Sequence, residues 1–286
     1  MKKRVRKVLI VILALVFVTS AAVLLHQQRG YRVGEDIYTR AEQLAQQPPA
    51  ALETLPEPSV TGETPPPSAS TQGQQTVLPP EQAAAQPQET PQPEFSLESL
   101  SIAALRQVSG DTVGWIKIPD TAISYPLVQG EDNDYYLDHA WDGTPTPVGA
   151  IFMDWRNAAD LTDFHTLIYG HRMKNGTMFT GLDYYESQSY WKNHPYVYIR
   201  LDERVITYAV FAAYEAPVRS PVYDLTLSDD AAKQAVIDFA LEQSVIDTGI
   251  IPTVTDCILT LSTCTGHGYE TRWVVQAVRL ETGAQD

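Results

Sequence analysis

The sequence has little of what several common kinds of site require. Only two of its 286 residues are cysteine, Cys257 and Cys264, and no cysteine or histidine pair has the spacing of a zinc site. It also shows no glycine-rich phosphate loop and no internal repeat. These absences argue against a structural zinc site, a P-loop nucleotide site and a repeat architecture. No acidic cluster suggests calcium, so we expect neither a metal nor another cofactor.

Positive charge is scarce after the first 30 residues. Residues 1–30 hold six Lys or Arg and no Asp or Glu. The remaining 256 residues hold 14 Lys or Arg against 35 Asp or Glu, a net charge of −21. An acidic body offers no electrostatic footprint for nucleic acid. Nucleic acid is therefore not expected as a partner.

The two cysteines are too far apart for a disulfide. If Cys257 and Cys264 belong to one strand, they lie roughly 23 Å apart, whereas a disulfide requires Cα atoms within about 7 Å. We therefore expect two free thiols. Cys257 reads as a small buried apolar residue, and Cys264 as an accessible thiol at a strand end.

The N-terminus carries a basic segment followed by a long apolar run. Lys and Arg dominate residues 1–7, and Val8–Leu25 is 18 residues without charge. That length is at the lower limit for a membrane span, and the basic end predicts a cytoplasmic N-terminus. The alternative is a cleaved signal peptide, for which Thr19-Ser20-Ala21-Ala22 is a faint cleavage site. We expect an uncleaved single-pass anchor over 8–25.

Proline-rich sequence separates this anchor from the folded part of the chain. Residues 48–93 hold 12 of the 20 prolines, together with many Gln, Thr and Ser. Such a composition buries too little apolar surface to fold alone. We therefore predict an extracytoplasmic linker over 26–95, with a short polar helix at Gly34–Gln47, and a folded domain over 96–286.

The sequence pattern of residues 113–280 predicts short strands separated by turns. About eight strands with few helices predict a mainly β fold, a closed or nearly closed eight-stranded barrel. One helix is expected over Ser96–Val108, capped by Ser96, and another after the N-cap Ser228, before the cysteine strand. The expected strands are Val113–Ile118, Ile123–Val128, Ala150–Met153, Thr166–Tyr169, Tyr196–Leu201, Val205–Glu215, Cys257–Thr263 and Trp273–Leu280.

The chemistry is expected at the last two strands. Thr260–Cys264 ends on a cysteine, and Arg272 opens the next strand after a short glycine-containing loop, as in a hairpin. A cation beside the thiol favours thiolate, and a cysteine nucleophile also needs a proton acceptor. His171 directly follows an apolar strand, while His267 in the hairpin loop is a local rival. The other histidines, His26, His139, His165 and His194, have no comparable context.

These residues resemble a known family. Thr260-Leu261-Ser262-Thr263-Cys264 followed by Arg272 resembles the TLxTC…R signature of sortases, and residues 169–179 resemble the segment around the active-site histidine of class B. The resemblance covers residues 96–280 and implies Cys264 as nucleophile, His171 as acid/base partner and Arg272 as stabiliser of the oxyanion or the substrate. One departure is Gly266, where some class B members have Asp, so no role of that carboxylate is transferred.

The resemblance implies a membrane-anchored transpeptidase that faces the cell wall of a Gram-positive bacterium. Its expected partners are sorting-signal peptides of secreted surface proteins, an amine of a cell-wall peptide or peptidoglycan precursor, and the cytoplasmic membrane. Two alternatives stay open. In a papain-like or other surface cysteine peptidase, the catalytic Cys is expected before the catalytic His in the chain, which is the reverse of the order here. An anchored binding protein would tolerate replacement of Cys264, His171 and Arg272.

Overall fold

The computed structural model describes residues 2–47, 96–202 and 204–280, which include eight strands in one closed barrel. The strand order around the barrel is β1-β2-β3-β4-β7-β8-β6-β5. Two neighbouring pairs are parallel, β2 with β3 and β4 with β7, and the others are antiparallel. The strands are β1 (Thr112–Lys117), β2 (Ser124–Val128), β3 (Ile151–Met153), β4 (His165–Tyr169), β5 (Tyr196–Leu201), β6 (Arg204–Pro217), β7 (Ile258–Cys264) and β8 (Thr271–Arg279).

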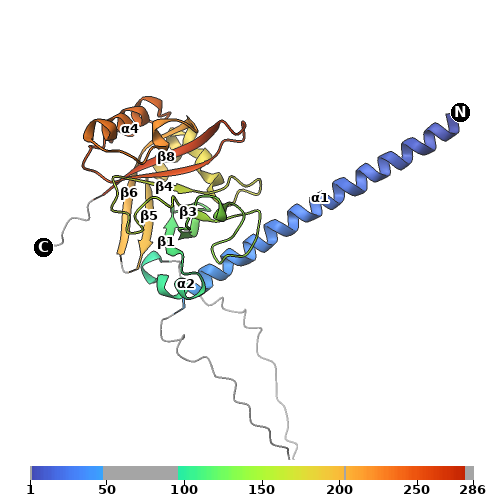
Figure 1. Cartoon of the computed structure of the whole chain (residues 1–286), viewed down its shortest axis with the longest axis horizontal. Coiled ribbons are helices and arrows are strands. Elements are labelled where there is room, and N and C mark those ends of the chain that lie inside the picture. The colour runs from blue at the N-terminus through green and yellow to red at the C-terminus, as the bar shows by residue number, and fades with distance from the viewer. Residues whose placement is uncertain (1, 48–95, 203, 281–286) are drawn as a thin grey trace, which may run out of the picture. The chain divides into compact units, whose positions relative to one another are not determined.

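The helices lie before and between these strands. In Figure 1, α4 covers the barrel on the side of β6, and α2 lies near β1. Their bounds are α1 (Lys2–Ala45), α2 (Ile102–Val108), α3 (Gln188–Asn193) and α4 (Asp230–Gln243), with short 3-10 helices η2 (Leu97–Ser99), η3 (Tyr135–Leu137), η4 (Phe179–Glu186) and η5 (Pro221–Tyr223).

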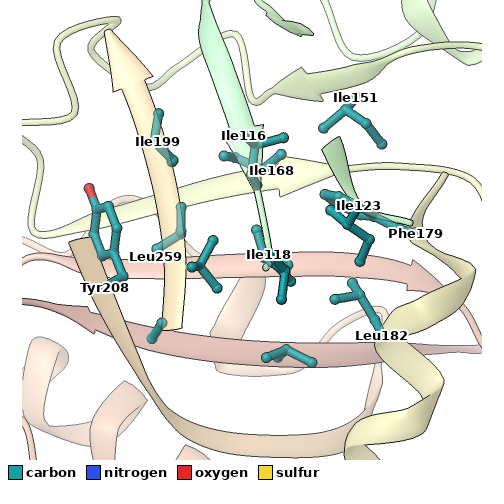
Figure 2. Close-up of a cluster of buried hydrophobic side chains, with 14 of the residues drawn as sticks. Ile116, Ile118, Ile123, Ile151, Ile168, Phe179, Leu182, Ile199, Tyr208 and Leu259 are labelled. Carbon is teal, nitrogen blue, oxygen red and sulfur yellow. The ribbon is translucent and has the colours of Figure 1, made fainter. Parts of the chain in front are cut away.

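Apolar side chains fill the barrel interior because alternate residues of each strand point inward. Figure 2 shows Ile116, Ile168, Ile199 and Leu259, from four different strands, converging there with Phe179 and Leu182 of η4. A second apolar cluster lies between the outer face of β6–β8–β7 and α4, and includes Phe211, Val274 and Ile237. Each of β7 and β8 is therefore covered on both faces over most of its length.

The predicted mainly β fold with an eight-stranded barrel is confirmed, and all eight predicted strands are present within two residues of their expected bounds. The helix caps differ. The helix expected from Ser96 starts only at Ile102, where the Ser101 side chain accepts a hydrogen bond from the Ala104 N–H. The late helix is capped by Asp229 instead of Ser228, since the Asp229 carboxylate accepts from Ala232 N.

The end of α1 packs against the barrel domain. Ile37, Ala41 and Ala45 are buried, and the Ala45 carbonyl accepts a 2.7 Å hydrogen bond from Ser101 N next to α2. Residues 26–45, the first part of the predicted linker, are helical, so the short helix expected at Gly34–Gln47 is the end of the longer helix α1. The proline-rich part of that predicted linker, 48–95, lies outside the described residues.

Within the described parts of the chain, none of the helices has both the length and the apolar character needed to cross a membrane. The single-pass anchor at 8–25, which falls within α1, stays a prediction of the sequence.

Candidate active site

The pairing of β7 with β8 places Cys264 directly beside Arg272. The two strands are antiparallel, and the last residue pair of their register is Cys264 with Arg272. Both side chains lie on the outer face of the barrel, where residues 258, 260, 262 and 264 of β7 point. Cys264 is half-buried, and neither it nor Cys257 forms a disulfide. The expected free thiols are confirmed, but Cys257 is half-buried ahead of β7 and not fully buried as predicted.

The parallel pairing of β4 with β7 brings His171 to the level of Cys264. Tyr169 pairs with Ser262 in this register, and Gly170 N donates a 3.2 Å hydrogen bond to Ser262 O. His171 and Cys264 each follow two residues later. The carboxyl ends of neighbouring parallel strands meet at one edge of a sheet. The cysteine and histidine, 93 positions apart, therefore leave the barrel at the same edge.

The His171 ring is held from one side. Its Nε2 lies 2.6 Å from the Leu137 carbonyl oxygen, and because a carbonyl only accepts, Nε2 carries the proton of this bond. Gly149 closes the same corner, since a Cβ there would lie 2.8 Å from His171 Cδ2 and 2.8 Å from Leu137 O. Gly149 also has φ +62, so two constraints favour glycine. Nδ1 is left as the nitrogen for proton exchange.

The Arg272 guanidinium is anchored by its own loop. Nη1 donates to the carbonyl oxygens of Tyr269, at 3.0 Å, and Thr271, at 2.9 Å. A guanidinium has five N–H donors in a rigid fork. Two of them can be used in these bonds, so donors to a developing oxyanion would come from Nε and Nη2. The arrangement holds a fixed positive charge beside the thiol.

Cys264, His171 and Arg272 line one cleft of about 300 Å³. All three predicted site residues thus lie together. The walls include Val218 and Tyr223, from the connection between β6 and α4. Sequence reasoning missed the part of the wall formed by Asn133, Leu137 and Phe152. The remaining lining residues are Tyr169, Gly170, Ser262 and Thr263.

Tyr223 and Ser262, which both line the cleft, form a polar contact. The Tyr223 hydroxyl and Ser262 Oγ share a 3.0 Å hydrogen bond. Burial raises the pKa of Tyr223 to about 12, with Ser262 and Arg272 acting in the opposite direction. Tyr223 therefore stays a neutral hydroxyl at neutral pH. Ser262 could have been found from the sequence, because it shares a strand face with Cys264, whereas Tyr223 lies in the short 3-10 helix η5, which the sequence did not predict.

A buried carboxylate fixes the wall that contains Asn133 and Tyr169. The fully buried Asp154 accepts hydrogen bonds from Tyr169 OH (2.9 Å), Asn133 Nδ2 (2.9 Å) and Arg156 Nη2 (2.8 Å). Burial alone would raise the pKa of Asp154, but these hydrogen bonds outweigh it and hold the pKa at about 2. Asp154 thus remains ionised and keeps both cleft residues oriented.

The competing histidines lie elsewhere or are engaged in other contacts. His267 is exposed in the hairpin loop, 3.8 Å from Glu215, and does not line the cleft. His165 is buried, with Nε2 2.7 Å from Thr260 Oγ1, and burial lowers its pKa to about 4. His139 stacks on Tyr135, and His194 Nδ1 lies 3.0 Å from the Tyr190 carbonyl. No side chain of His26 is described.

Gly266, the position at which some class B members have Asp, lies close to Arg172. It has φ +80, and a Cβ at this position would lie 3.0 Å from Arg172 Nη1. Arg172 instead forms an ion pair with Asp183. A carboxylate at 266 would thus meet a guanidinium that already has a partner here.

A family model described as "Sortase domain" matches residues 116–280. The curated protein Sortase B of Listeria monocytogenes is 34% identical over 174 residues, which are 60% of this chain and 71% of that protein. Two solved sortase B structures, one of the Staphylococcus aureus enzyme in a substrate complex and one of a sortase B in complex with triglycine, are each 31% identical. Each has a TM-score of 0.60, over 63% of this chain and 85% of theirs.

Proposed function

This chain belongs to the sortase family of cysteine transpeptidases, with class B relatives, and on that premise we propose how it acts and on what. It cleaves the C-terminal sorting signal of secreted surface proteins and transfers them to an amine of the cell wall. The observation that carries this proposal is the Cys264–Arg272 pair, which shares one cleft with His171.

The first half-reaction makes a thioacyl enzyme. Cys264 Sγ attacks a backbone carbonyl of the sorting peptide, and the carbonyl oxygen becomes an oxyanion. Arg272, fixed by two carbonyl contacts, donates hydrogen bonds to that oxyanion. The C–N bond then breaks as His171 protonates the leaving amine. The Nε2 bond to Leu137 assigns this proton to Nδ1.

The second half-reaction reverses these roles with a new amine. An acceptor amine attacks the thioacyl carbonyl while His171 takes its proton, and the Cys264 thiolate leaves as the new amide forms. Water in place of the amine would give the free acid. The lining of the cleft includes Tyr223, Val218 and Leu137. These apolar surfaces suit an extended peptide that excludes water from the thioester.

The likeness to relatives extends the proposal to the partners. The S. aureus relative is known in complex with a substrate, and a sortase B relative is known in complex with triglycine. The same two ligand classes are proposed here: a sorting peptide as donor and a cell-wall peptide amine as acceptor. We also propose residues 8–25 as a single-pass anchor that leaves the catalytic domain facing the cell wall. The anchor proposal rests on the basic residues 1–7 and the uncharged run that follows them.

The test replaces each of the two cysteines in turn, in the full chain kept in detergent. Wild type, Cys264→Ala and the matched control Cys257→Ala are incubated with a panel of sorting-signal peptides, with and without triglycine or hydroxylamine. We expect Cys264→Ala to lose at least about 10³-fold in turnover, as for other nucleophile removals, with an unchanged circular dichroism spectrum. Intact mass should show a thioacyl adduct on wild type and on Cys257→Ala.

The outcomes separate the alternatives. An adduct released by the amine as a new amide supports the transpeptidase, and release only to the acid supports a peptidase. Turnover retained in Cys264→Ala would refute the mechanism. A folded wild type that forms no adduct with any peptide favours an anchored binding protein.

A further inference from the structure

We propose that Tyr38, on the last part of α1, is a positioning residue that holds His171 in its working orientation. The inference rests on the proposed acid/base role of His171. It concerns a helix that precedes the residues matched by the family model, 116–280. Two independent contacts of Tyr38 lead to the two sides of His171.

The first contact is with the segment behind the His171 ring. Tyr38 OH donates a 2.5 Å hydrogen bond to the Gly149 carbonyl, across 111 positions of sequence. The helix backbone also approaches this segment closely, because a Cβ on Gly34 would lie 2.7 Å from Val148 Cγ2. Burial raises the pKa of Tyr38 above its ordinary value, so the hydroxyl remains a donor throughout the assay range of pH.

Gly149 transmits this contact to the histidine. A Cβ on Gly149 would lie 2.8 Å from both His171 Cδ2 and the Leu137 carbonyl oxygen. The same Leu137 oxygen accepts the 2.6 Å bond from His171 Nε2. A movement of Gly149 therefore changes the packing of the ring and the position of its hydrogen-bond acceptor together.

The second contact is with the loop that follows His171. The Tyr38 ring packs edge-on against Tyr125, with centroids 5.2 Å apart at 85°, and Tyr125 OH accepts a 2.9 Å hydrogen bond from Met178 N. Met178 is buried and has φ 58, an uncommon conformation for a non-glycine residue. It is bridged to Arg172, and Phe179 N donates to the His171 carbonyl at 2.9 Å.

Tyr38 therefore supports the backbone of His171 on one side and the acceptor of its ring on the other. Loss of the hydroxyl should release the ring without emptying the cleft, so catalysis should suffer more than peptide binding. Small misplacements of a catalytic group are known to cost large factors in rate.

The experiment compares Tyr38→Phe and Tyr38→Ala with Tyr185→Phe, in the full chain. Tyr185 is the matched control because its buried hydroxyl donates a 2.7 Å bond to the His194 carbonyl, outside the cleft. The readouts are kcat, KM and the pH profile of kcat/KM for the sorting peptide, the melting temperature, and the ring ¹⁵N signals of His171 by NMR. The NMR readout needs no turnover.

We expect Tyr38→Phe to lower kcat about 10-fold, with KM within about two-fold, and Tyr38→Ala to lower it further. The His171 signals should change from one Nε2–H tautomer to a mixture, and the limb of the pH profile that reports His171 should shift. Tyr185→Phe should lower the melting temperature and leave the activity and the His171 signals as in wild type.

Unchanged His171 signals and kcat in Tyr38→Phe would overturn the proposal. An equal loss of activity in Tyr185→Phe would also overturn it, because the effect would then be one of general stability. Failure of the proposed function gives a different result. In that case His171→Ala would keep full transfer activity, while Tyr38→Phe would still change the tautomer of His171.

Discussion

The two faces of β7 are held by different forces, although they alternate residue by residue. Leu259 and Leu261 point into the barrel and are fully buried in its apolar core. On the outer face, Thr260 and Ser262 lead to Cys264 and are buried in a polar layer. From Thr260 onward, one face of the strand is fixed by packing and the other by hydrogen bonds, and the nucleophile lies at the end of the second.

The polar layer ties together the four strands that surround the site. His165 of β4 contacts Thr260 Oγ1 at 2.7 Å, and Gln276 of β8 donates to the same oxygen at 2.8 Å. Tyr214 of β6 donates to Gln276 at 2.8 Å. Packing between methyl groups tolerates small sliding, whereas hydrogen bonds weaken steeply when geometry changes. We infer that this layer fixes the register of β4, β7 and β8, on which the meeting of His171, Cys264 and Arg272 depends.

The largest effect should come from the charged end of the outer face. Arg272→Ala removes the proposed oxyanion donor and should lower kcat by about 10²–10³-fold, as loss of one such donor does elsewhere. Arg279→Ala, at the opposite end of β8, is the control and should stay near wild type. Steady-state kinetics gives kcat for both variants, and thermal melts give their stability. Equal effects of the two substitutions would assign the loss to β8 as a whole.

Adjacent residues on opposite faces allow a direct test of packing against hydrogen bonding. Leu261→Ala should lower the free energy of unfolding by about 3 kcal/mol, because it opens a cavity in the core. Ser262→Ala should lower it by only about 1 kcal/mol, the size of one hydrogen bond. Chemical denaturation gives both values. If the Ser262 variant were the less stable of the two, the packing account of the inner face would be wrong.

Acid should weaken the polar layer through His165. Burial depresses its pKa from 6.5 to about 4. Between pH 6.5 and pH 4, this histidine is therefore protonated in the unfolded chain and neutral in the folded chain. Stability from this group is thus full above pH 6.5 and is lost as pH falls toward 4, by about 3 kcal/mol in all.

Denaturation at several pH values checks this, with His165→Gln as the comparison. The variant should lose the slope between pH 6.5 and 4 and keep a later loss near pH 2–4, where Asp154, with its pKa of about 2, becomes protonated. An unaltered slope in His165→Gln would place the acid sensitivity in another group.

The difference between the two faces also explains what could be read from the sequence. The inner face produces strict apolar alternation, so the eight strands and the ends that carry Cys264 and Arg272 were predictable. The outer contacts join residues far apart in sequence, such as Tyr223 with Ser262 or Leu137 with His171, and no local pattern encodes them. The packing of α1 on the barrel was missed for the same reason, because a polar helical segment does not reveal where it docks. The caps at Ser101 and Asp229 were each misplaced because several nearby residues could serve equally well.

The smallest effect is expected at the Tyr223–Ser262 hydrogen bond, where the polar layer reaches the cleft. Tyr223→Phe keeps the ring and removes the hydroxyl, so unfolding should become easier by about 1 kcal/mol. Because Ser262 borders the cleft, water can replace the lost partner and limits the loss. A double-mutant cycle with Ser262→Ala isolates the bond, and its coupling energy should be about 0.5–1 kcal/mol. A coupling energy of zero would mean that this contact only fills space, and that the hydrogen-bonded support of the outer face ends at Thr260, two residues before it reaches Ser262.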